Sequence, residues 1–236
     1  MITNRKTFIF GLLLLLSFLA VFALIMSPVF GSGRNGLEYA DDMFNSLSKG
    51  SAYFIPEEME KAGKLTGTAI DVHLAAATRE EAATWAKLYG TAGAQVDVTG
   101  TEVNIKGDLG VIFKAILVDC DAMYHNRDDT LRSSYGLSGR EATYAWYNSL
   151  NSMKKQLEKQ KMFAEASAVQ SLVKKAVEPA YNYYGITAKS VADYKGIVFL
   201  LMSFYIIYTI WYGFAFYYLF DGLGITTTKA ARKVEA

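Results

Sequence analysis

Two long apolar runs lie near opposite ends of the chain, and the residues between them alternate between apolar and polar positions. Residues 7–27 and 196–220 contain no Asp, Glu, Lys or Arg. A helix rises about 1.5 Å per residue and the hydrocarbon core of a bilayer is about 30 Å thick, so about 20 apolar residues can span it. The pattern predicts two transmembrane helices that flank a central domain.

A cleaved signal peptide is the alternative interpretation of the first run. Arg5 and Lys6 would supply its basic leading region, and residues 29–31 weakly satisfy the small-residue rule for cleavage. However, the apolar run is longer than the roughly 7–15 residues of a signal peptide. The length favours a retained anchor.

Basic residues beside the two runs predict the orientation of the chain, because segments rich in Lys and Arg stay in the cytoplasm. Such residues precede the first run and follow the second: Arg5, Lys6, Lys229, Arg232 and Lys233. Residues 1–6 and 221–236 are therefore expected to be cytoplasmic tails, and residues 28–195 to be extracytoplasmic. Lys189 and Lys195 flank the second run from its extracytoplasmic side and reduce the difference in basic charge on which this orientation depends.

Residues 28–55 are predicted to form a linker and an amphipathic helix, and residues 56–126 a small α+β unit in the order αβαββα. Residues 68–75 alternate as a half-buried strand does, and residues 95–106 have the pattern of a hairpin. The capping pattern T-x-x-E begins a helix at Thr78, and Asp108 caps another. The apolar positions expected to face the core of this unit include Ile70, Val72, Leu74, Trp85, Leu88, Tyr89, Val96, Val98, Val103, Ile105, Leu109, Ile112, Phe113, Ile116, Cys120 and Met123.

Residues 127–195 are predicted to be helical. A second capping pattern begins a helix at Ser138, and Pro179 is expected to kink or break a later helix near Glu178. Ser190 is expected to cap a helix that enters the second apolar run. The predicted fold is an α+β membrane protein with two transmembrane helices flanking an extracytoplasmic domain, which consists of the αβαββα unit and a helical hairpin-like second half.

Composition and charge exclude several classes of function. The net charge of +1 argues against a nucleic-acid surface, and a single cysteine, Cys120, cannot form an intramolecular disulfide. The chain has no N-x-S/T acceptor, which favours a prokaryotic inner membrane. Neither apolar run contains a histidine or a charged residue, so no haem or ion path is expected in them. No nucleotide-binding or hydrolase motif occurs, and no cofactor is predicted.

One pair of polar residues has the spacing of metal ligands. Asp121 and His125 lie four positions apart, on one face of the predicted helix. The alternative is an acidic helix end that leads into a solvated loop. We prefer this alternative, because Cys120 falls on the apolar stripe of the helix and so points away from Asp121 and His125. His73 is a similar case: an exposed imidazole could sense pH, but it is more often an ordinary surface residue.

The second apolar run is rich in tyrosine. Tyr205, Tyr208 and Tyr212 lie on one helical face, and a phenol hydroxyl in hydrocarbon needs a hydrogen-bond partner. Ser17 is the one hydroxyl residue near the middle of the first run. Packing of this face against another subunit is the sharper hypothesis; the alternatives are a belt at the membrane interface or pairing within the chain, and binding of a quinone or lipid.

Two anchors around an outer domain resemble the layout of bacterial sensory receptors and polysaccharide co-polymerases. Tails of about six and fifteen residues are too short for signalling output, and the proline-rich segment typical of the co-polymerases is lacking. The sequence thus favours a non-catalytic accessory or assembly subunit, with membrane lipid and other membrane subunits as its partners. The alternatives are an extracytoplasmic module that binds a lipid, glycan or small metabolite, and an enzyme whose site the sequence hides.

Overall fold

The structure is a computed structural model that describes residues 2–225, and the chain forms two compact units. The apolar unit contains residues up to Phe44 and residues from Ser190 onward, and the central unit contains Asn45–Lys189. The predicted basic tail with Lys229, Arg232 and Lys233 lies outside the described residues.

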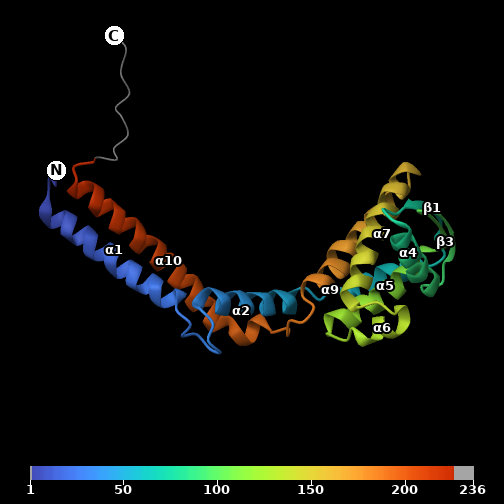
Figure 1. Ribbon diagram of the computed structural model, residues 1–236, viewed down its shortest axis with the longest axis horizontal. Coiled ribbons are helices and arrows are strands. Elements are labelled where there is room, and N and C mark those ends of the chain that lie inside the picture. The colour runs from blue at the N-terminus through green and yellow to red at the C-terminus, as the bar shows by residue number, and fades with distance from the viewer. Residues whose placement is uncertain (1, 226–236) are drawn as a thin grey trace, which may run out of the picture. The chain divides into compact units, whose positions relative to one another are not determined.

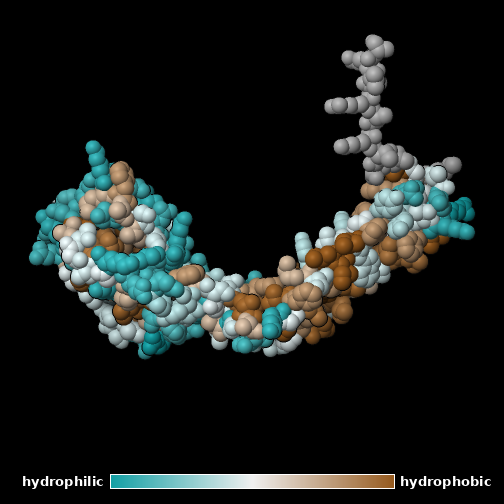
Figure 2. Space-filling view, turned by 180° about the vertical axis from the view of Figure 1, so that it is seen from behind, coloured by the Kyte–Doolittle hydropathy of each residue, from teal (hydrophilic) through white to brown (hydrophobic). Residues whose placement is uncertain are grey.

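The apolar unit is built on two antiparallel helices, α1 (Arg5–Met26) and α10 (Val191–Gly222), which lie side by side in Figure 1. Both are long and apolar enough to cross a membrane, and Figure 2 shows apolar residues along this unit. Helix α10 begins before the apolar run, because the Ser190 side chain accepts a hydrogen bond from the Ala192 N–H at 3.3 Å. The predicted cap at Ser190 is therefore confirmed.

Small and aromatic residues form the interface between α1 and α10. A Cβ atom added to Gly11 would lie 2.6 Å from the backbone nitrogen of Leu219, so only glycine allows this approach. Further along, the rings of Phe18 and Tyr208 stack with their centroids 4.2 Å apart. Close backbone contact at small residues is a common way for helices to associate in lipid.

The central unit contains a three-stranded antiparallel sheet in the order β1-β3-β2. Its chain order is αβαββα, as the sequence predicted, and the elements are α3 (Ile55–Lys64), β1 (Ala69–Ala75), α4 (Arg79–Thr91), β2 (Gln95–Thr99), β3 (Glu102–Asp108) and α5 (Leu109–Tyr124). Before them in the chain lies α2 (Gly36–Ser51). The central unit is thus a mixed α+β structure.

The predicted apolar face of the sheet is confirmed for β1 and β3, where Ile70, Val72 and Ile105 are buried. It is wrong for the end of β2, because Val98 is 44% exposed. Strand β2 lies at the edge of the sheet, and the helices leave this end of it uncovered. Alternation alone cannot reveal that difference, because it marks a face of a strand and not the area that a helix covers.

The second half of the central unit is helical, and consists of α6 (Asp129–Tyr135), α7 (Gly139–Lys159), α8 (Phe163–Leu172), the π-helical turn η1 (Val173–Val177) and α9 (Glu178–Asn182). The capping box at Ser138 is confirmed: its hydroxyl accepts from the Glu141 N–H, and the Glu141 carboxylate accepts from the Ser138 N–H.

Pro179 is expected to kink or break the helix near Glu178; the chain is not interrupted there, but the α-helical pattern gives way to the π-turn η1 directly before Glu178. The chain stays helical through η1 and α9, and the N–H of Glu178 donates to the carbonyl oxygen of Val173, five residues earlier. Proline has no N–H and its ring collides with the carbonyl four residues before it in an α-helix. A wider π-turn relieves that collision, and such turns occur often at functional sites.

Candidate functional site: a tyrosine-lined cleft

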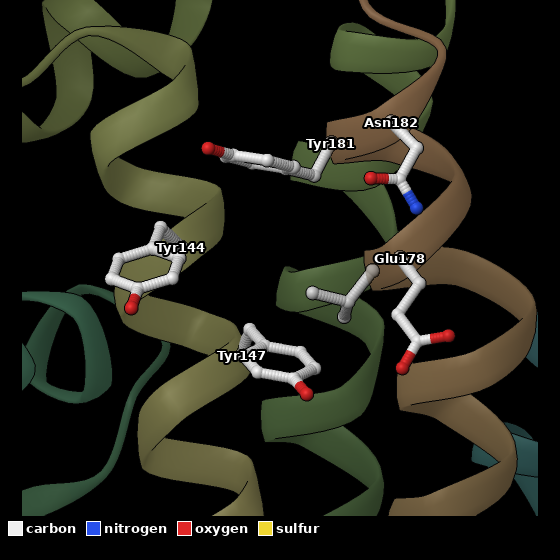
Figure 3. Close-up of a pocket in the computed structure, with 6 residues that line it drawn as sticks. Tyr144, Tyr147, Glu178, Tyr181 and Asn182 are labelled. Carbon is white, nitrogen blue, oxygen red and sulfur yellow. The ribbon is translucent and has the colours of Figure 1, made fainter.

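A cleft of about 280 Å³ opens on the central unit between α7 and the η1–α9 segment. Figure 3 shows its walls: the ring of Tyr147 points from α7 towards the facing helix, and the ring of Tyr181 points back towards α7. Six residues line the cleft: Tyr144, Tyr147, Val177, Glu178, Tyr181 and Asn182. It is therefore an aromatic cleft with one carboxylate and one amide.

Local structure explains why the tyrosines face outward. Tyr144 and Tyr147 lie three residues apart, on the exposed side of α7, whereas Trp146 and Leu150 on its other side are fully buried. On the facing helix, Glu178 and Tyr181 have the same three-residue spacing. Residues three apart share one helical face, so each helix presents a pair of side chains to the cleft.

The aromatic rings contact one another across the cleft. The ring centroids of Tyr144 and Tyr147 lie 6.4 Å apart, and those of Tyr144 and Tyr181 lie 6.2 Å apart. Beside them, the Arg140 guanidinium lies 5.8 Å from the Tyr181 ring centroid and 5.7 Å from that of Tyr184. This surface already holds one cation against aromatic rings.

The sequence reasoning did not identify this cleft. Tyr144 and Tyr147 interrupt no pattern, and they lie more than 30 residues before Tyr181. The available signal was a helix with a buried Trp146 on one side and two tyrosines on the other. That signal is weak, because nothing in the sequence places α9 opposite these tyrosines.

The structure also locates the predicted metal candidates. The Nδ1 atom of His125 lies 3.3 Å from a carboxylate oxygen of Asp121. That same carboxylate accepts a hydrogen bond from the Tyr53 hydroxyl at 2.7 Å and contacts Arg127 at 3.3 Å. Burial and the Asp121 carboxylate raise the pKa of Tyr53 to about 12. Within residues 2–225 no group of three or more His, Cys, Asp or Glu could hold a metal ion.

The neighbouring Asp119 lies in the core of the central unit. It is 8% exposed, and its Oδ2 atom accepts hydrogen bonds from the Tyr135 hydroxyl at 2.7 Å and from Trp146 Nε1 at 2.9 Å. Burial raises the pKa of Asp119, although the two donors oppose that change. Cys120 beside it is buried, and burial raises the pKa of its thiol well above the ordinary value.

The predicted tyrosine face of α10 is divided in two. Tyr208 and Tyr212 both contact the Phe18 ring, at centroid distances of 4.2 and 5.2 Å, so part of the face pairs within the chain. Tyr205 is 66% exposed. The Ser17 hydroxyl donates to the Leu14 carbonyl oxygen, and the buried Tyr208 hydroxyl has no partner among the described residues.

No protein-family model matches this sequence, and no characterised protein or solved structure is significantly similar to it.

Proposed function

We propose that this protein is a non-catalytic, membrane-anchored accessory or assembly subunit of a larger membrane complex, and that its central unit docks an extracytoplasmic partner. The observation that carries the proposal is the cleft between α7 and α9, where three tyrosines are at least 36% exposed. Tyrosine is enriched at the centres of protein interfaces, because it offers a large contact area at a small cost in conformational entropy.

The membrane part of the proposal depends on α1 and α10. We place both chain ends in the cytoplasm of a prokaryotic cell, because Arg5 and Lys6 precede the first apolar helix. Tyr205 and Tyr212 are exposed on α10, and this face would meet lipid and the helices of other membrane subunits.

The first experiment is purification from the native membrane in a mild detergent, followed by a native gel and mass spectrometry of the bands. We expect a defined assembly larger than the monomer. The double variant Tyr147→Ala, Tyr181→Ala should release the protein from it. Phe163→Ala is the matched control, because Phe163 is 64% exposed and does not line the cleft.

A monomer or homo-oligomer in the wild-type sample would contradict the proposal. In that case the cleft would be tested as a site for a small ligand, by measuring the shift in melting temperature on adding candidate glycans, lipids or metabolites.

A further inference from the structure

One carboxylate in the cleft has no charge partner. Glu178 makes no ion pair or hydrogen bond with its side chain to any residue that the structure describes. By contrast, Glu58 in the same unit contacts Lys61 at 2.6 Å and Lys175 at 3.9 Å. Lys175, three residues before Glu178, is thus engaged with Glu58, and Glu178 itself is half-buried and lines the cleft.

Aromatic rings next to a free carboxylate make a site for a cation. The face of an aromatic ring carries partial negative charge, and a cation within about 6 Å of its centroid gains about 0.5–2 kcal/mol. The Arg140 guanidinium already lies 5.8 Å from the ring centroid of one cleft tyrosine, Tyr181. A second cation that entered the cleft would meet these aromatic rings and the Glu178 carboxylate, which line it together.

We propose that the cleft receives an arginine side chain of the docked protein partner, with its guanidinium stacked on the tyrosines and bound to the Glu178 carboxylate. This inference rests on the proposed docking function. A guanidinium is planar, stacks on aromatic faces and donates two parallel hydrogen bonds to a carboxylate. The cleft volume of about 280 Å³ leaves room for one such side chain.

The test uses the full-length protein in detergent, with 3-fluorotyrosine placed at Tyr147, and follows its fluorine NMR signal. The probe is N-acetyl-argininamide, and the uncharged control is N-acetyl-citrullinamide, which has nearly the same shape. We expect a saturable shift with the arginine probe and none with the citrulline probe. Glu178→Gln should weaken the arginine response about fivefold, which corresponds to about 1 kcal/mol.

Glu178→Gln keeps the shape of the side chain, and an unchanged circular dichroism spectrum will show that this variant is folded. Equal responses to both probes, or an unchanged affinity in Glu178→Gln, would overturn the inference. A stronger response to tetramethylammonium would do the same, because it would indicate the headgroup of a choline lipid as the occupant.

Two measurements separate this inference from the docking proposal. If the native assembly depends on the cleft tyrosines but the arginine probe produces no shift, the docking role stands and the arginine inference fails. If the probe binds but the native protein is a monomer, the docking proposal fails, and with it the assignment of the cation to a protein partner.

Discussion

Replacement of Asp119 tests how the core of the central unit is held together. Its Oδ2 atom is the acceptor for two buried donors, Trp146 Nε1 and the Tyr135 hydroxyl. In Asp119→Ala both donors lose this acceptor, and each unpaired buried donor costs about 1–3 kcal/mol. Removal of a buried charge offsets part of that loss. We expect Asp119→Ala to lower the free energy of unfolding by about 2–3 kcal/mol at pH 7.

Asp119→Asn is the matched control. Its amide oxygen can accept both hydrogen bonds and it carries no charge, so we expect a change of less than about 1 kcal/mol. The assay is urea unfolding of the full-length protein in detergent, followed by the near-ultraviolet circular dichroism of Trp146 and its neighbours. Equal loss in both variants, or no loss in Asp119→Ala, would refute the assignment of these hydrogen bonds.

The difference in free energy of unfolding between wild type and Asp119→Asn should depend on pH. Burial raises the pKa of Asp119 above its ordinary value of 3.8, so between these two pKa values the folded state holds a proton that the unfolded state has released. The stabilising contribution of Asp119 is therefore complete below pH 3.8 and is lost as the pH rises through the folded pKa. Because Asp119→Asn does not titrate, the stability of wild type relative to this variant should fall over that range.

Two further predictions concern the apolar helices. Gly11→Leu should separate α1 from α10, because a Cβ at Gly11 would lie 2.6 Å from the backbone of α10. The assay is the rate of disulfide formation between cysteines introduced at Phe18 and Tyr208, which should fall. Gly213→Leu is the control and should leave this rate unchanged, because a Cβ at Gly213 meets nothing within 4 Å. The double variant Tyr205→Phe, Tyr212→Phe should weaken the native complex on a gel, because both residues are exposed on α10 and the change removes the hydroxyls that they offer to a neighbouring subunit. Unchanged copurification would show that this face is not an interface.

Much of the secondary structure could be predicted because it depends on neighbours in the sequence. The capping box at Ser138 and the cap at Ser190 are local patterns, and both are present. The alternation in residues 68–75 and the hairpin that follows also gave the order αβαββα. These signals depend on the spacing of apolar residues and on hydrogen bonds within a few residues.

The candidate site could not be predicted, because it depends on residues distant in sequence. Asp119 had the local features of an acidic helix end, but its two donors are 16 and 27 residues away and place it in the core. The cleft requires α9 to face Tyr144 and Tyr147, whereas Pro179 predicted a kink or a break in this helix. The π-turn before Pro179 keeps the helix continuous and so brings Tyr181 opposite α7.

Lys49 joins the beginning of the central unit to its end. Its ammonium group is buried and donates to the carbonyl oxygens of Tyr183 and Ile186 at 3.1 and 2.6 Å, and the N–H of Lys189 donates to the carbonyl oxygen of Ser46. The two ends of residues 45–189 are thus joined by hydrogen bonds. A domain with adjoining ends can be grafted into a surface loop of another protein without stretching its host. The adjoining ends of residues 45–189 therefore meet the geometric requirement for insertion of this unit into one surface loop of a soluble carrier, where binding could be studied without lipid.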